Sequence, residues 1–155
     1  MLENVIDEAG FAKIMKKSIQ DIIIHFFETE QNFGILCKIE EVSFDPVLPE
    51  SINSEFRALT LFFLAGYTFE TAKIEDGYLT FEAGFGADNY GSVVSLPLLS
   101  IMQIIIDETP VFINLSVYKD KEERQAVGIK DESGVENSMA SFLNNPENSK
   151  FLKKK

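Results

Sequence analysis

The sequence predicts a mainly β domain with an N-terminal helix (an α+β fold), built as a small twisted antiparallel sheet or a partly open barrel. Apolar residues recur every three or four positions up to residue 33 and alternate in short runs between residues 34 and 118. Residues 119–155 are polar and poor in aromatics, so we expect them to stay flexible. The chain therefore divides into a helix (1–33), a β-rich domain (34–118) and an acidic tail (119–155).

The N-terminal segment has the period of an amphipathic helix. Its apolar stripe widens toward Phe26 and Phe27, where Ile22 and Ile23 also contribute, so apolar residues cover more than one face. The apolar face of such a helix is covered either by the core of its own chain or by a second chain. We expect it to form a two-fold dimer contact, with a break possible at Gly10 because glycine weakens a helix interior.

Turn residues separate short apolar runs in the middle of the chain, as in a β domain. Asp76-Gly77 is a strong hairpin signal, because type I′ turns need positive φ. Pro97 fits the first position of a short helix, where its missing N–H has no cost. The expected strands span residues 34–41, 57–64, 67–74, 78–85, 92–96 and 111–118, and a helix is expected over residues 98–106.

Composition excludes several classes of protein. The chain of 155 residues has one Cys and one His, which exclude an internal disulfide and multi-cysteine or histidine-rich metal sites. Its formal net charge of −11 repels phosphate backbones and makes nucleic acid an unlikely partner. The start is acidic and the apolar stretches are too short to span a bilayer, so we expect a cytoplasmic protein without membrane contact.

No residue pattern specifies catalysis. His25 has no nucleophile in a diagnostic position, and Cys37 alternates with apolar neighbours as a buried thiol does. The glycines of residues 84–91 lack the spacing and the following helix of a phosphate-binding loop. We therefore predict a non-enzymatic protein with no catalytic residues, metal or cofactor. An enzyme built around His25 is the least supported hypothesis.

The remaining hypothesis is that the β-rich segment is a binding domain. A small open sheet can add an extended peptide as a strand, and Gly84 and Gly86 would let another backbone approach. The tail ends in Ser-Lys-Phe-Leu-Lys-Lys-Lys (residues 149–155), which combines apolar and basic residues. That segment is either a short docking peptide or a solvated end whose lysines aid solubility.

The stretch Tyr78–Ile106 resembles the stringent starvation protein B (SspB) family, the peptide-tethering adaptors of the ClpXP protease. The resemblance rests on Leu-Thr-Phe-Glu-Ala-Gly-Phe-Gly (79–86) and Val-Val-Ser-Leu-Pro-Leu (93–98), followed by an apolar run. The order of the elements along the whole chain is also similar.

This resemblance implies an Sm-like β-barrel that dimerises through its N-terminal helix and binds unstructured degradation tags, such as the tmRNA-encoded ssrA tag, in a groove. It also implies that the C-terminal tip docks on the zinc-binding domain of the ClpX unfoldase. The residues that would border the groove are Ala83, Gly84, Phe85, Val93, Val94 and Ser95, and the tip residues are Phe151, Leu152 and Lys153.

The chain also departs from the family. Gly84 stands where the family often has a basic residue, the loop 86–91 lacks its proline, and the tip has lysines in place of arginines. These changes remove positive charge that could meet an acidic tag, so peptide binding is better supported than ssrA preference. The alternative function is an Sm-like or barrel interaction module without a protease link, which self-assembles or binds RNA.

Overall fold

The computed structural model describes residues 1–119, which fall into two units. The described part of the first unit comprises residues 1–11 and 117–119 and contains α1 (Leu2–Ile6). Within it, the backbone N–H of Val117 donates a hydrogen bond to the carbonyl of Ile6 at 2.8 Å. The second unit, residues 12–116, contains all the strands and carries the candidate site.

The long helix α2 (Ala9–Thr29) contributes directly to the core of the second unit. Ile19 and Ile23 are fully buried in that core, whereas Lys17 and Asp21 lie on the solvent side and form an ion pair at 3.0 Å. The helix begins after a break at residues 7 and 8, just before Gly10. Within residues 1–119, no helix has both the length and the apolar character needed to cross a bilayer.

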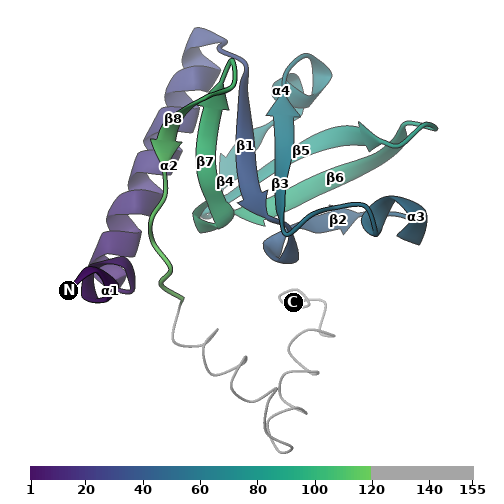
Figure 1. Cartoon of the computed structure of the whole chain (residues 1–155). Coiled ribbons are helices and arrows are strands. Elements are labelled where there is room, and N and C mark those ends of the chain that lie inside the picture. The colour runs from purple at the N-terminus through teal and green to yellow at the C-terminus, as the bar shows by residue number, and fades with distance from the viewer. Residues whose placement is uncertain (120–155) are drawn as a thin grey trace, which may run out of the picture. The chain divides into compact units, whose positions relative to one another are not determined.

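The strands form two four-stranded antiparallel sheets (Figure 1). The first has the order β3 (Leu59–Leu64), β1 (Phe33–Lys38), β7 (Ile101–Ile106), β8 (Thr109–Ile113). The second has the order β2 (Ser43–Asp45), β6 (Tyr90–Pro97), β5 (Tyr78–Phe85), β4 (Lys73–Glu75). The remaining elements are the short helices α3 (Glu50–Asn53) and α4 (Tyr67–Thr71) and two 3₁₀ turns, η1 (Ile39–Glu41) and η2 (Leu98–Ser100).

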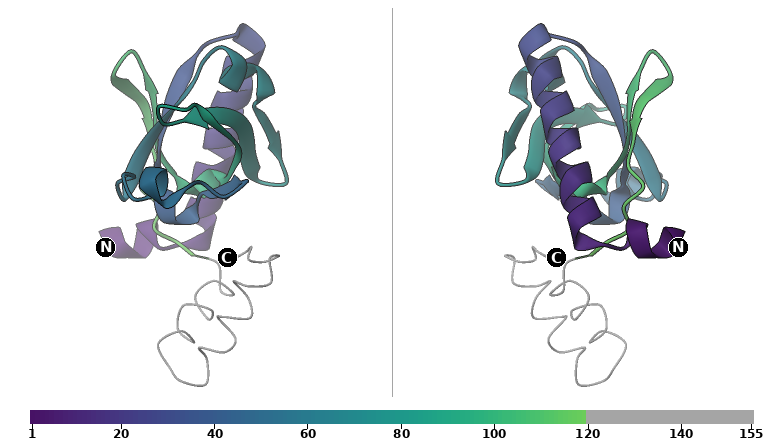
Figure 2. Two further views of the ribbon diagram at one scale, coloured as in Figure 1. Left: turned by 90° about the vertical axis from the view of Figure 1, so that its right-hand side faces the viewer. Right: turned by 90° about the vertical axis from the view of Figure 1, so that its left-hand side faces the viewer.

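The two 3₁₀ turns pass the chain from one sheet to the other. The turn η1 joins β1 to β2, and η2 joins β6 to β7. Figure 2 shows the strands curving around a common interior, with α2 running across one side. The predicted α+β class is confirmed, but the strand pairs in residues 1–119 do not close into a barrel.

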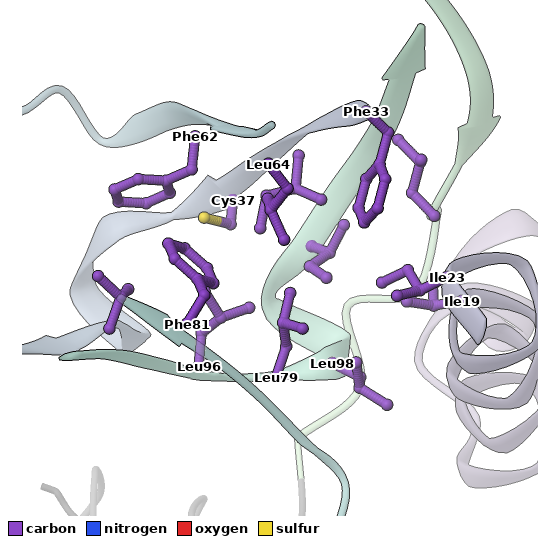
Figure 3. Close-up of a cluster of buried hydrophobic side chains, with 14 residues drawn as sticks. Ile19, Ile23, Phe33, Cys37, Phe62, Leu64, Leu79, Phe81, Leu96 and Leu98 are labelled. Carbon is purple, nitrogen blue, oxygen red and sulfur yellow. The ribbon is translucent and has the colours of Figure 1, made fainter. Parts of the chain in front are cut away.

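The core fills the space between these sheets and α2 (Figure 3). Phe33 and Leu64 come from the first sheet, and Leu79 and Phe81 from the second; all four are at most 1% exposed. Full burial of a side chain of this size stabilises the fold by about 1.5–3 kcal/mol. The core therefore holds the strands that carry the site in a fixed position.

The hairpin predicted at Asp76-Gly77 is confirmed. The two residues join β4 to β5 and have φ angles of 54° and 80°, as a type I′ turn requires. Asp76 tolerates positive φ better than most residues with a side chain. The strand that follows places Leu79 and Phe81 in the core, as its alternation indicated.

The predicted helix over residues 98–106 is wrong, because only the turn η2 and the central strand β7 are found there. Leu98, Ile101 and Ile104 are fully buried and three residues apart, which resembles a helical repeat. The pairing of β7 with β1 shifts by one residue at Leu36/Cys37. Such a bulge changes the two-residue period of a strand locally to three, and the β-branched isoleucines favour the strand.

The strand expected over residues 67–74 is also wrong for most of its length. Gly66 has φ +60°, which turns the chain sharply after β3 and starts the single turn α4. Phe69 then packs edge-on against Phe27 and Phe33, with ring centroids 5.8 and 6.3 Å apart. The extended part is reduced to β4, which lies at the edge of the second sheet.

Candidate peptide-binding groove

The outward face of the second sheet forms the floor of the candidate site. Glu82 on β5 lies opposite Val93 on β6, and Gly84 lies opposite Gly91. Asp45 on β2 lies opposite Val93 from the other side. Residues that are directly opposite in an antiparallel pair share a face. The floor therefore runs continuously over three adjacent strands.

Of the two glycines in this floor, only Gly91 leaves it open, because the side chain of Asn89 covers Gly84. A Cβ atom placed on Gly91 would have no heavy atom within 4 Å, so space is open above it. A Cβ atom on Gly84 would collide with the side chain of Asn89, which folds back over that glycine. Asn89 adopts a left-handed φ of 52° in the turn that joins the strands. An approaching backbone therefore has its closest access at Gly91.

Beyond Thr80, the helix α4 contacts the edge of β5 in place of a strand. Within residues 1–119, β4 pairs only with Tyr78–Thr80, so the second half of β5 has no strand on that side. The backbone N–H of Glu82 donates to Oγ1 of Thr71 at 2.9 Å. Alternate residues of a strand direct their N–H and C=O groups to the same side. The main-chain groups of Gly84 therefore point to the same side of β5, where no described strand pairs with them.

A cavity of about 590 Å³ lies over this floor. One wall is formed by Ala65, Tyr67 and Thr68, at the end of β3 and the start of α4, and the opposite end by Asp45 and Pro46. Figure 1 shows the β5–β6 hairpin between α4 and β2, with α3 near its tip. The volume is in the range of ligand-binding clefts. We call this cavity the groove.

The groove is negatively charged. Asp45 and Glu82 are its charged lining residues, and among the described residues no Lys, Arg or His lines it. The hydroxyl of Tyr67 donates a hydrogen bond to Oε1 of Glu82 at 2.5 Å. This hydrogen bond, together with the carboxylate charge, raises the pKa of Tyr67 above its usual value. The phenol therefore stays protonated and holds the carboxylate in place.

The six residues predicted to border a groove are distributed over both faces of the hairpin. Ala83, Gly84 and Val93 line the groove. Ser95 faces outward beyond its lining, and its carbonyl accepts a hydrogen bond from the hydroxyl of Ser43 at 3.3 Å.

The other two predicted residues point inward. Val94 is fully buried opposite Phe81. Phe85 packs edge-on against Phe44 and Phe56, with ring centroids 5.6 and 6.1 Å apart. These two side chains support the floor of the groove from below.

Sequence reasoning did not find Asp45, Tyr67 or Asn89. Asp45 and Tyr67 lie in segments far from the hairpin in sequence, and only the fold brings them to it. The one available signal was the proline-rich loop beginning at Asp45-Pro46, because loops that border a sheet often carry binding residues.

Cys37 and His25 lie away from the groove. The Cys37 side chain is buried in the core, and this burial raises the pKa of its thiol to about 12, with a smaller contribution from the charge of Glu41. A thiol in this environment is a poor nucleophile. His25 is exposed on α2. Within residues 1–119, no group of three or more His, Cys, Asp and Glu side chains is arranged to hold a metal ion.

The tip residues Phe151, Leu152 and Lys153 lie outside the described residues. A comparison of the chain with protein-family models finds no match, and comparisons with curated proteins and with solved structures likewise find none.

Proposed function

We propose that this protein is a non-enzymatic adaptor that binds unstructured peptide tags in the groove and delivers tagged proteins to the ClpXP protease. The observation that carries the proposal is the groove itself. It combines a cavity of about 590 Å³ with a glycine at its floor, over which space is open. An extended peptide that crosses the strands can bring its main chain close to the floor at this glycine, while its side chains contact the lining residues.

The resemblance of Tyr78–Ile106 to the SspB family supports the same function. Ala83, Gly84 and Val93, which the resemblance assigns to the tag-binding groove, all line the cavity. We also propose that the two curved sheets correspond to the family's Sm-like barrel, although their strand pairs do not close in residues 1–119. In support, a long helix precedes antiparallel strands, and 3₁₀ turns bend the chain between the two sheets.

In this proposal the tip of the chain provides the second contact. Phe151 and Leu152 would enter an apolar site on the ClpX unfoldase, and the neighbouring lysines would add electrostatic attraction. A bound substrate would then be held near the unfoldase at a raised effective concentration.

The test uses purified ClpXP, a tagged fluorescent reporter and the full chain. We expect the full chain to accelerate degradation when the reporter is dilute. Replacing residues 149–155 with a Gly-Ser segment of equal length should abolish the acceleration without changing peptide binding. If neither the protein nor this replacement alters the rate of degradation, the adaptor proposal is wrong.

An interaction module without a protease link is the second candidate. The outward face of β3 favours it, because Leu59, Leu61 and Phe63 are 47%, 47% and 62% exposed. Exposed apolar side chains that lie side by side often mark a contact with another protein. This candidate takes precedence if peptides occupy the groove but ClpXP activity does not respond.

We further propose that the adaptor acts as a cytoplasmic homodimer in which α2 contributes to the interface. Ile19 and Ile23 are used within the chain's own core, so they are not available to a partner. Ile14 is 60% exposed on the same helix and is the apolar residue that a second copy could cover.

A further inference from the structure

The two carboxylates of the groove are held at a fixed spacing. Asp45, Val93 and Glu82 lie opposite one another on three consecutive strands, and their side chains share the outward face. Neighbouring strands are about 4.8 Å apart, so the two acidic residues are separated by roughly 10 Å. The exposed side chain of Val93 lies between them.

No cation of the described chain neutralises these carboxylates. The ion pairs of residues 1–119 join Lys17 to Asp21, Lys38 to Glu41, Lys73 to Glu75, and the N-terminus to Glu3. Glu82 instead accepts the hydrogen bond of Tyr67, and a neutral phenol leaves its charge in place. An acidic segment bound here would meet two like charges in a partly enclosed space, which is costly.

The ring of Tyr67 adds a second preference for positive charge. This residue is 64% exposed at the wall of the groove, and its hydroxyl is tied to Glu82. The face of an aromatic ring attracts Lys and Arg side chains, and the carboxylate of Glu82 beside the Tyr67 hydroxyl attracts the same charge. The apolar stem of a lysine can also lie along Val93 while its ammonium group reaches a carboxylate.

The groove has room for an extended backbone that carries such side chains. From β5 across β6 to β2 there are two strand spacings, or about 10 Å, which an extended peptide covers with roughly three residues. Gly91, which has open space above it, lies near the middle of this path. Alternate side chains of an extended segment share a face, so two basic residues two positions apart would both point into the groove and reach Glu82 and Asp45 with their long side chains.

We infer that the groove selects extended peptide segments with two basic side chains, so the tags it binds are cationic. This inference rests on the proposed peptide-binding function and specifies its substrate class. It is opposite in charge to an acidic degradation tag. Selection comes from the pair Asp45 and Glu82, and Val93 and Gly91 supply contacts that are independent of charge.

The test measures fluorescence anisotropy of labelled octapeptides with the full chain. The lysine peptide is Ala-Ala-Lys-Ala-Lys-Ala-Leu-Ala, in which both lysines share a face, and two further peptides have Gln or Glu in place of both lysines. At low salt we expect the lysine peptide to bind about tenfold more tightly than the Gln peptide, since an exposed ion pair contributes up to about fivefold in affinity. The Glu peptide should bind most weakly, and added salt should reduce the differences.

A matched pair of double variants separates the local carboxylates from the overall charge of the chain. Changing Asp45→Asn together with Glu82→Gln should remove the preference for lysine, so that the lysine and Gln peptides bind with equal affinity. Glu28→Gln together with Glu50→Gln makes the same change in net charge at exposed positions outside the groove and should keep the preference.

Equal binding of the lysine and Glu peptides, or a lysine preference that survives in the groove variant, would overturn the inference and leave peptide binding intact. If none of the three peptides binds, the proposed function fails, and the inference fails with it.

Discussion

Filling the floor of the groove at Gly91 is the sharpest test of its location. Gly91→Val adds a side chain where a Cβ atom would have no neighbour within 4 Å. Gly91 is not among the glycines with positive φ, so valine fits its backbone without strain. Valine favours strands and glycine weakens them, so the free energy of unfolding should stay level or rise by up to about 1 kcal/mol.

The new side chain would hold a bound peptide away from the floor. The apolar contact surface that the peptide then loses sets the expected loss of affinity. Full burial of a valine is worth about 1.5–3 kcal/mol. Val93 is 41% exposed, so a peptide that covers it gains about 1 kcal/mol there. The peptide loses a similar amount from its own apolar surface, for a total near 2 kcal/mol, or about thirtyfold in affinity.

The assay combines anisotropy with the Gln octapeptide and urea unfolding of the same samples. The matched control is Thr80→Val. Thr80 lies on β5, on the outward face of the same sheet as Gly91, but outside the groove lining. Its hydroxyl is buried without a hydrogen-bond partner, so the change should not lower stability or affinity. Gly84→Val must push Asn89 aside and should cost stability, unlike Gly91→Val. Unchanged peptide affinity in a stable Gly91→Val protein would show that the floor is not the binding site.

Two further predictions concern Cys37 and Ile14. Because burial raises the pKa of Cys37 to about 12, the folded state keeps a proton that the unfolded chain loses near its ordinary value of 9.0. The free energy of unfolding should therefore fall as pH rises above about 9, and a thiol reagent at pH 8 should react only after denaturation. Cys37→Ala should remove the contribution of this group to the pH dependence of the free energy of unfolding, which urea titrations at several pH values measure. For Ile14, the change to Glu should shift the light-scattering mass of the full chain from dimer toward monomer without loss of fold, since the residue is 60% exposed. A monomeric wild-type protein would contradict the dimer.

The local features of the fold were accessible from the sequence. The turn at Asp76-Gly77 and the alternation in the following strand depend on nearest neighbours and on side-chain direction, which a short segment encodes by itself. The sequence predicts a helix where β7 forms, because buried residues recur there every three positions, as in a helix. The bulge that produces this spacing depends on the partner strand β1. The turn α4 likewise depends on the place of Phe69 beside Phe27 and Phe33.

The same division applies to the candidate site. Val93 and Val94 are identical side chains, and only the register against β5 decides that Val93 faces the groove opposite Glu82 and Val94 the core opposite Phe81. By itself, the sequence determined the hairpin turn at Asp76-Gly77, the glycines of the following strands and the acidic character of the chain. These are properties of short segments and of composition. Only the tertiary structure placed Asp45 and Tyr67 at the groove, because contacts between distant segments are set by how the sheets pair and pack around one core.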